Sequence, residues 1–120
     1  YLELQKDCIQ IYTGVYEPNK EQLSNIRYFI AENLPTFNKI IQQKSFVKRY
    51  GSIQGEKNKI IPSDLKQAAE KQKLIYNKNF YCACQLDKSS IFSDKLIKEI
   101  ISCYKDAKAL NQFFEQALNA

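Results

Sequence analysis

The sequence predicts an α+β fold, in which a small, mainly antiparallel sheet packs against several helices. Residues 1–16 alternate apolar and polar side chains as a β-hairpin does, and residues 80–86 form a second apolar run of strand length. Between and after these strands, apolar residues recur at helical spacing. Strands and helices do not alternate regularly enough for a doubly wound parallel sheet. At 120 residues, a single domain, residues 1–120, is expected.

The hairpin is expected to use residues 2–4 and 9–11 as alternating strands, with a turn at Lys6-Asp7. Gly14 interrupts the second strand, which predicts a bulge or a close approach of two backbones. Pro18 ends this strand, because proline has no amide hydrogen to donate to a neighbouring strand.

The remaining elements follow from helical spacing, caps and breakers. Pro35 predicts a break between the first two helices, Gly51 a C-terminal cap, and Asn111 a bend in the last helix. Residues 51–63 read as a loop that ends in a short extended piece at 60–62. The expected helices are Pro18–Asn33, Thr36–Gln43, Ser45–Tyr50, one from Ser63 or Asp64 to about Ile75, and one that begins near Ser93 and continues almost to the end.

Charge is distributed unevenly along the chain. Residues 39–78 hold ten Lys or Arg against three acids, a net +7, whereas the whole chain carries +5. A concentration of positive charge can bind or steer an anion. The chain has no histidine, so a Ser or Cys nucleophile would need a lysine or a carboxylate as its base. No sequence pattern supports such a pair, and no catalytic residue is assigned.

The four cysteines are Cys8, Cys82, Cys84 and Cys103. Their spacing matches neither a dense secreted disulfide framework nor a zinc site, so no metal or other cofactor is expected. Cys82 and Cys84 would point to one face of a strand, as small buried hydrophobes. Reduced cysteines favour a cytoplasmic protein. No apolar run approaches the ~20 residues of a membrane span, and no secretory leader is seen.

Four segments resemble one family. Residues 14–27 follow the pattern G-x-Y-x-P…L…R, and residues 51–62 the pattern G-x-x-x-G-(E/D)-x-x-K-x-x-P. Residues 74–81 are similar to L-L-x-x-K-x-F, and residues 109–114 to a closing P-L-x-x-F-L. The order and spacing of these segments resemble those of Domain of Unknown Function 2461, a conserved hypothetical family of bacteria and fungi.

The resemblance implies a fold more than a role. Family members are longer and have an N-terminal helical portion, so the chain is similar to their C-terminal part, and a completing segment would be missing or lie on another chain. Relatives carry histidines where this chain has Glu3, Asp7-Cys8 and residues 64–70. Any chemistry of those histidines would be absent here.

Arg27 is the first candidate binding residue, because it lies at the edge of the apolar arc of its helix. Its guanidinium could hold a phosphate or a carboxylate. The alternatives are an internal salt bridge, to Glu3 or Glu56, and a side chain that reaches solvent. Lys57 and Lys59 lie in a glycine-containing loop that could cradle an anion.

Lys78, which the resemblance matches to the family's lysine, would lie at the mouth of the strand at 80–86. The sequence therefore favours a non-catalytic domain that binds an anionic small molecule or a protein partner. One alternative is nucleic-acid binding through residues 39–78, with Phe46, Tyr50 and Tyr76 as stacking platforms. Another is an enzyme half-site completed by a missing N-terminal segment, which predicts an exposed apolar patch on the hairpin and the last helix.

Overall fold

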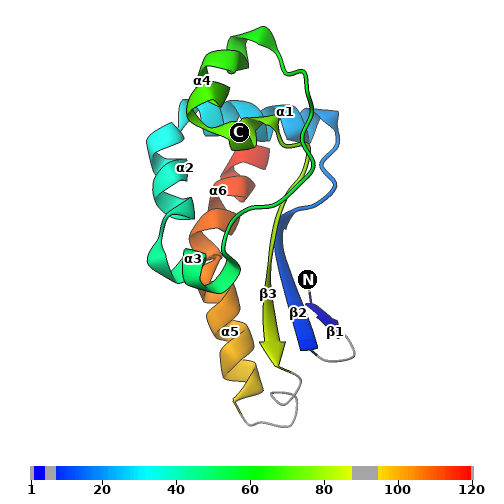
Figure 1. Cartoon of the computed structure of the whole chain (residues 1–120), viewed down its shortest axis with the longest axis vertical. Helices are drawn as coiled ribbons and strands as arrows, with labels where there is room; N and C mark the ends of the chain where they lie inside the picture. The colour runs from blue at the N-terminus through cyan, green and yellow to red at the C-terminus, as the bar shows by residue number, and fades with distance from the viewer. Residues whose placement is uncertain (1, 5–7, 88–94, 120) are drawn as a thin grey trace.

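The computed structural model describes residues 2–4, 8–87 and 95–119, and it has the predicted α+β architecture (Figure 1). The molecule is elongated, with extents of 51 × 25 × 24 Å. Its elements are, in chain order, β1 (Leu2–Leu4), β2 (Cys8–Val15), α1 (Lys20–Glu32), α2 (Leu34–Ile41), α3 (Lys44–Tyr50), the 3₁₀ helix η1 (Ser63–Leu65), α4 (Lys66–Lys71), the 3₁₀ helix η2 (Lys73–Tyr76), β3 (Phe80–Asp87), α5 (Leu96–Asp106) and α6 (Lys108–Leu118).

The sheet has the order β1-β2-β3, and both strand pairs are antiparallel. The hairpin and the strand near residues 80–86 are thus confirmed, while the Lys6-Asp7 turn lies outside the described residues. The central strand β2 pairs with β3 over its whole length, from Cys8 opposite Asp87 to Val15 opposite Phe80. Strand β1 covers only residues 9–11 of β2.

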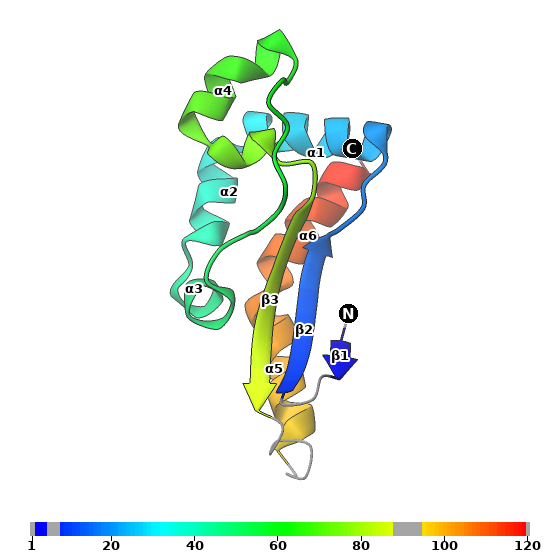
Figure 2. The ribbon, with the colours of Figure 1, turned by 45° about the vertical axis from the view of Figure 1, so that its right-hand side comes forward.

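The two faces of the sheet differ. Alternate residues of β2 and β3 are buried against the helices, and Figure 2 shows α5 and α6 running behind the sheet. Aromatic rings extend the core from this face to the other helices. The Phe114 ring lies 5.6 Å from that of Phe80 in β3, and the Phe113 ring lies 5.1 Å from that of Phe37 in α2. Within the described residues, the opposite face of the sheet carries no helix.

Gly14 makes the close backbone approach that its place in the strand predicts. Its φ is +107°, and a Cβ built on it would lie 2.2 Å from the carbonyl oxygen of Phe80. Any side chain would therefore push β2 away from β3. The glycine keeps the two longest strands in contact at the end of the sheet nearest to α1.

Helix α1 begins as expected, with a capping box at Asn19. The Asn19 side chain accepts from the Gln22 amide, and the Gln22 side chain accepts from the Asn19 amide. The predicted break at Pro35 is wrong in position. Pro35 lies in the first turn of α2, where the missing amide hydrogen costs nothing, and the chain breaks at Asn33. Gly51 ends α3 with a positive φ of 79°, as predicted.

The helix predicted from residue 63 to Ile75 is three short pieces, η1, α4 and η2. Neither Ser63 nor Asp64 caps it. It breaks at Gln72, which is extended and uses its side chain to accept from the amide of Leu74 and to donate to Asn38. Residues 60–62 form no strand; the loop instead makes its bridges at residues 54 and 57.

The last predicted helix is two, and they meet at Ala107 rather than bending at Asn111. Ala107 is fully buried, and its small side chain lets the two helices change direction against the core. Asn111 stays inside α6, where its side chain accepts a bond from Thr13 of β2. Ser93, the predicted cap, lies outside the described residues.

We expect Gly14→Ala to lower the free energy of unfolding by roughly 2–3 kcal/mol, because it adds a clash with the backbone to an unfavourable φ. Gly51→Ala is the matched control, since its φ is also positive but a Cβ would meet nothing within 4 Å. It should cost only about 1 kcal/mol. Urea unfolding followed by far-UV circular dichroism measures both, and equal losses would contradict the assigned backbone approach.

Candidate functional site

Arg27 lies on α1, beside the buried Ile26, and only 7% of it is exposed. Its Nη2 donates to the carbonyl oxygens of Tyr76 at 3.3 Å and Asn77 at 3.1 Å. Its Nε is buried and has no hydrogen-bond partner in the described part of the chain. The guanidinium is thus held by the backbone at one nitrogen, and its other nitrogens donate to no group within the described residues.

No carboxylate neutralises this buried charge in the described residues. The alternative salt bridges to Glu3 and Glu56 do not form, because Glu56 pairs with Lys78 at 2.9 Å and Glu3 lies at a different hollow. Burial lowers the pKa of Arg27 from its ordinary value, as expected for a cation that has lost its water. Arginine nevertheless stays charged in proteins, so a buried positive charge remains.

The Arg27 hollow, a surface pocket of about 270 Å³, opens at this side chain. It lies between the first two turns of α1 and the segment that leads into η1. Lys20 and Asn58 contribute polar side chains to its wall. Tyr28 lines it as well, and its hydroxyl donates to the two carboxylate oxygens of Asp64 at 2.9 and 3.0 Å.

The loop 51–62 and Arg27 donate hydrogen bonds to the same carbonyl oxygen, that of Tyr76. The Tyr76 oxygen accepts from Arg27 Nη2 and also from the amide of Asn58, at 2.8 Å. A second backbone bond joins the Lys78 amide to the Glu56 oxygen at 2.8 Å. The buried Asn77 lies beneath this loop with its Oδ1 unpartnered. Arg27 and Asn77 both make hydrogen bonds, yet within the described residues each keeps one buried polar atom without a partner. These atoms are the donor Nε of Arg27 and the acceptor Oδ1 of Asn77.

The three predicted lysines are placed differently from Arg27. Lys57 and Lys59 flank Asn58, and both are exposed, but only Asn58 is part of the wall. Lys78 is bound to Glu56. Sequence reasoning missed Lys20, although its spacing of seven residues from Arg27 puts both on one helix face.

Two of the three aromatic residues of the basic stretch are not available for base stacking. Phe46 and Tyr50 are buried and stack on each other at 5.5 Å. The Tyr50 hydroxyl donates to the Cys103 carbonyl oxygen at 2.6 Å. Arg49 forms an ion pair with Asp106 at 3.1 Å. The nucleic-acid alternative thus retains only lysines and the half-buried Tyr76.

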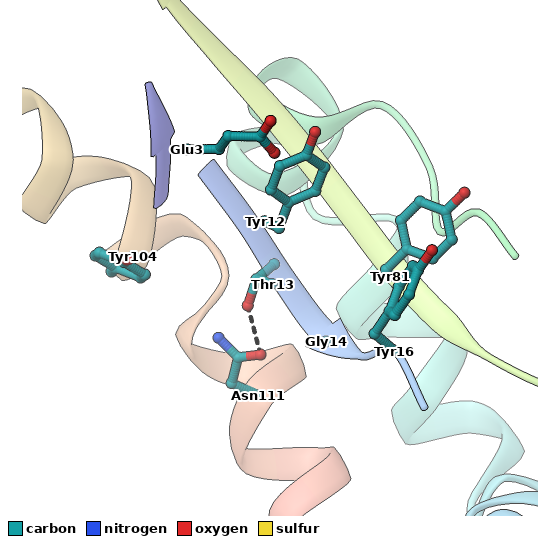
Figure 3. A pocket seen from close by; sticks show the side chains of 8 residues that line it. All are labelled: Glu3, Tyr12, Thr13, Gly14, Tyr16, Tyr81, Tyr104 and Asn111. Carbon is teal, nitrogen blue, oxygen red and sulfur yellow. Dashed lines mark hydrogen bonds between the residues drawn. The ribbon is translucent and has the colours of Figure 1, made fainter. Parts of the chain in front are cut away.

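A larger hollow of about 920 Å³ lies along the edge of β2, beyond the end of β1 (Figure 3). Four tyrosines line it, and Glu3 is its acidic residue. We call it the tyrosine hollow. No sequence prediction identified it; the signal available was the pair Tyr12 and Tyr16 on either side of Gly14.

Apolar side chains are exposed on the hairpin and on α5. Leu4 of β1 is 67% exposed, and Ile97 and Ile101 of α5 are 70% and 60% exposed. Leu2 and Tyr104 are also exposed. Ile97, Ile101 and Tyr104 are spaced as one helical stripe, and Tyr104 shares the tyrosine hollow with β1. These five side chains form the apolar surface.

The four cysteines are reduced and buried. Cys84 lies 3.3 Å from Cys103, sulfur to sulfur. Burial raises the pKa of Cys82 and of Cys84 to about 12, so neither is a thiolate at neutral pH. Among the described residues, no three His, Cys, Asp or Glu side chains form a metal-binding group. None of the described helices combines the length and apolar character that crossing a membrane requires.

A family model described as "Conserved hypothetical protein (DUF2461)" matches residues 1–113. The chain belongs to this family. The match spans Arg27, the loop 51–62 and β3, and it confirms the resemblance to this family. No curated protein and no solved structure gives a match.

In this DUF2461 protein, we expect iodoacetamide at pH 8 to leave Cys82 and Cys84 unmodified in the native state. With a pKa of about 12, about one such thiol in 10⁴ is ionised, and the thiolate is the reactive form. Unfolding in guanidinium chloride should expose both, as peptide mass spectrometry would show. Burial raises the pKa of both thiols above the value of about 8.5 that they have in the unfolded chain. Their contribution to stability is therefore fully present below about pH 8.5, and it is lost as the pH rises from there towards the folded pKa of about 12. Rapid native alkylation would contradict the burial.

Proposed function

We propose that this DUF2461 protein is a non-catalytic binding domain that takes an anionic ligand at the Arg27 hollow. The observation that carries the proposal is the buried guanidinium, which has no carboxylate partner in the described residues and an unpartnered Nε. Removing one partner from a buried ion pair is strongly destabilising. A buried cation without a counter-ion is therefore an unusual feature, and an incoming anion would complete it.

The donors at this place suit a small oxyanion. A guanidinium presents five N–H groups in a plane that matches phosphate or carboxylate geometry. Arg27 uses Nη2 for the backbone and lines the hollow, and its Nη1, which makes no hydrogen bond within the described residues, is the nitrogen left to a ligand. Lys20, on the same face of α1, adds a second positive charge at the wall. Lys57 and Lys59 stand near the rim, and in this proposal they steer the anion rather than hold it.

The volume limits the ligand. At about 270 Å³, the hollow is at the lower end of small-molecule sites, which are roughly 300–1,000 Å³. It suits a single phosphate, sulfate or carboxylate group with a small substituent. The carboxylate of Asp64 is held by the Tyr28 hydroxyl, which lessens its repulsion of an anion at the rim.

We expect sodium sulfate and inorganic phosphate to raise the thermal unfolding temperature more than sodium chloride at equal ionic strength, because a ligand of the folded state stabilises it. Lys20→Ala should weaken sulfate binding roughly two- to fivefold, since an exposed ionic contact is worth about 0.5–1 kcal/mol. Isothermal titration calorimetry gives the affinities.

Lys98→Ala is the matched control, because Lys98 is exposed on α5, away from α1 in Figure 1. It removes the same charge and should leave sulfate binding unchanged. Arg27→Lys should abolish measurable binding, with circular dichroism confirming that it folds. Equal stabilisation by sulfate and chloride, or equal effects of Lys20→Ala and Lys98→Ala, would contradict the proposal.

The second candidate function is to bind a protein partner, and the apolar surface is the observation that favours it. Scattered exposed hydrophobes are ordinary, but a patch shared by β1 and one helix stripe is typical of an interaction site. Its place on the hairpin and the final helical region is also where a completing segment would pack. The occupant that fits is a protein segment with an apolar face.

We expect Ile97→Ser with Ile101→Ser to lower the binding of the dye 8-anilinonaphthalene-1-sulfonate with little change in the free energy of unfolding, because these side chains are mostly exposed. Ile60→Ser is the control, since Ile60 is 84% exposed in the loop, outside the apolar surface. It should leave dye binding nearly unchanged. A marked loss of stability in the double variant would assign these residues to the core and remove the docking surface.

A further inference from the structure

The tyrosine hollow differs from the Arg27 hollow in charge. The chain holds 18 Lys or Arg, yet strands β1, β2 and β3 contain neither residue. The sheet carries two carboxylates, those of Glu3 and Asp87. Glu3 forms no ion pair within the described residues, and it lies at the wall of the hollow. An otherwise basic chain thus has a face whose formal charge is negative.

The walls of the hollow are rich in aromatic rings. Tyr12 and Tyr16 come from β2 and its end, Tyr81 from β3 and Tyr104 from α5. The rings of Tyr16 and Tyr81 lie 5.3 Å apart with 60° between their planes. Figure 3 shows these two rings together on one side of Gly14. Gly14 lies in the wall between Tyr12 and Tyr16.

We propose that the tyrosine hollow binds an organic cation, an alkylammonium or guanidinium group, with tyrosine rings as its walls and Glu3 as its counter-charge. A cation within about 6 Å of an aromatic ring centroid is attracted by the electrons of the ring face. The Glu3 carboxylate adds an ordinary charge attraction. The volume of about 920 Å³ lies in the usual range for small ligands, roughly 300–1,000 Å³.

The same lining argues against other ligand classes. An anion would meet Glu3, and the described residues of the wall include no Lys or Arg to attract it. A neutral ligand would leave the carboxylate without a role. Asn111 offers a further contact: its Oδ1 accepts from Thr13 at 2.7 Å, so its amide nitrogen remains for a ligand hydroxyl.

Two sources could supply the cation, a free small molecule or a basic side chain of an extended peptide. Strand β1 covers β2 only over residues 9–11, so in the described chain Thr13–Val15 pair with β3 alone. A peptide could therefore lie along this edge and place a basic side chain among the rings. Both sources share the same recognition chemistry, and separate arms of the test distinguish them.

The test compares choline with its neutral isostere, 3,3-dimethylbutan-1-ol, by two-dimensional NMR and calorimetry on the full chain. Choline should bind at least about fivefold more tightly, because only it gains the attraction of the rings and of Glu3. The signals of Tyr16 and Tyr81 should move. In the second arm, a five-residue peptide with a central arginine is compared with its citrulline analogue and with acetyl-arginine amide.

Glu3→Gln should weaken choline binding while leaving the isostere unchanged, and Tyr16→Ala should weaken choline binding in the same way. Asp87→Asn is the matched control, because it removes a carboxylate from a strand end away from the hollow. Arg27→Lys should also leave choline binding unchanged, so this proposal stands or falls independently of the anion site. Tighter binding of the arginine peptide than of acetyl-arginine amide assigns the site to a peptide, and equal affinities assign it to free cations. Equal affinity for choline and the isostere, or no binding of any cation, would overturn the proposal.

Discussion

The bonds from Arg27 to the carbonyls of Tyr76 and Asn77 organise the upper half of the molecule. They join α1 to the segment between η2 and β3, and the loop 51–62 attaches to the same Tyr76 oxygen. Three parts of the chain that are far apart in sequence therefore meet at one buried cation. An apolar side chain could pack here, but it could not satisfy either carbonyl. The same guanidinium keeps donors that the fold does not use, so one residue serves both structure and the proposed binding.

The fold also separates the basic residues of the chain from the carboxylates of the sheet. The basic residues of the middle third lie in α2, α3, α4, η2, the loop 51–62 and the segment before β3. Two of them, Lys78 and Arg49, are neutralised by Glu56 and Asp106. The sheet has no basic residue, and helices cover only one of its faces. The molecule thus offers two hollows of opposite character, one at a buried guanidinium and one among tyrosines and a carboxylate. Binding chemistry at the two is independent because they use different elements.

Patterns with one local cause were predictable from the sequence. Alternation in the hairpin predicted β1 and β2, and the apolar run at residues 80–86 predicted β3. The glycine at position 51 ended α3 with a positive φ, as expected. Breaks that depend on tertiary contacts were not. The helix ends at Gln72 because its side chain bonds to Asn38, 34 residues away, and the turn at Ala107 follows from packing against the core. In the same way, Arg27 was identifiable from its position on the helix, whereas its carbonyl partners were not. The tyrosine hollow draws on five elements, β1, β2, β3, α5 and α6, that only the fold brings together.

The NMR signal of the Arg27 Nε proton is the most direct reporter of an anion bound at this guanidinium. The chain has two arginines, Arg27 and Arg49, so the side-chain region of a ¹H–¹⁵N spectrum holds two Nε–H signals. Arg49 Nε already donates to Asp106 at 3.1 Å and serves as an internal reference. On titration with sulfate at constant ionic strength, the account predicts a saturable shift of the Arg27 signal with the Arg49 signal fixed. An Arg27 signal that stays in place, or moves only in step with that of Arg49, would contradict an anion site at this guanidinium.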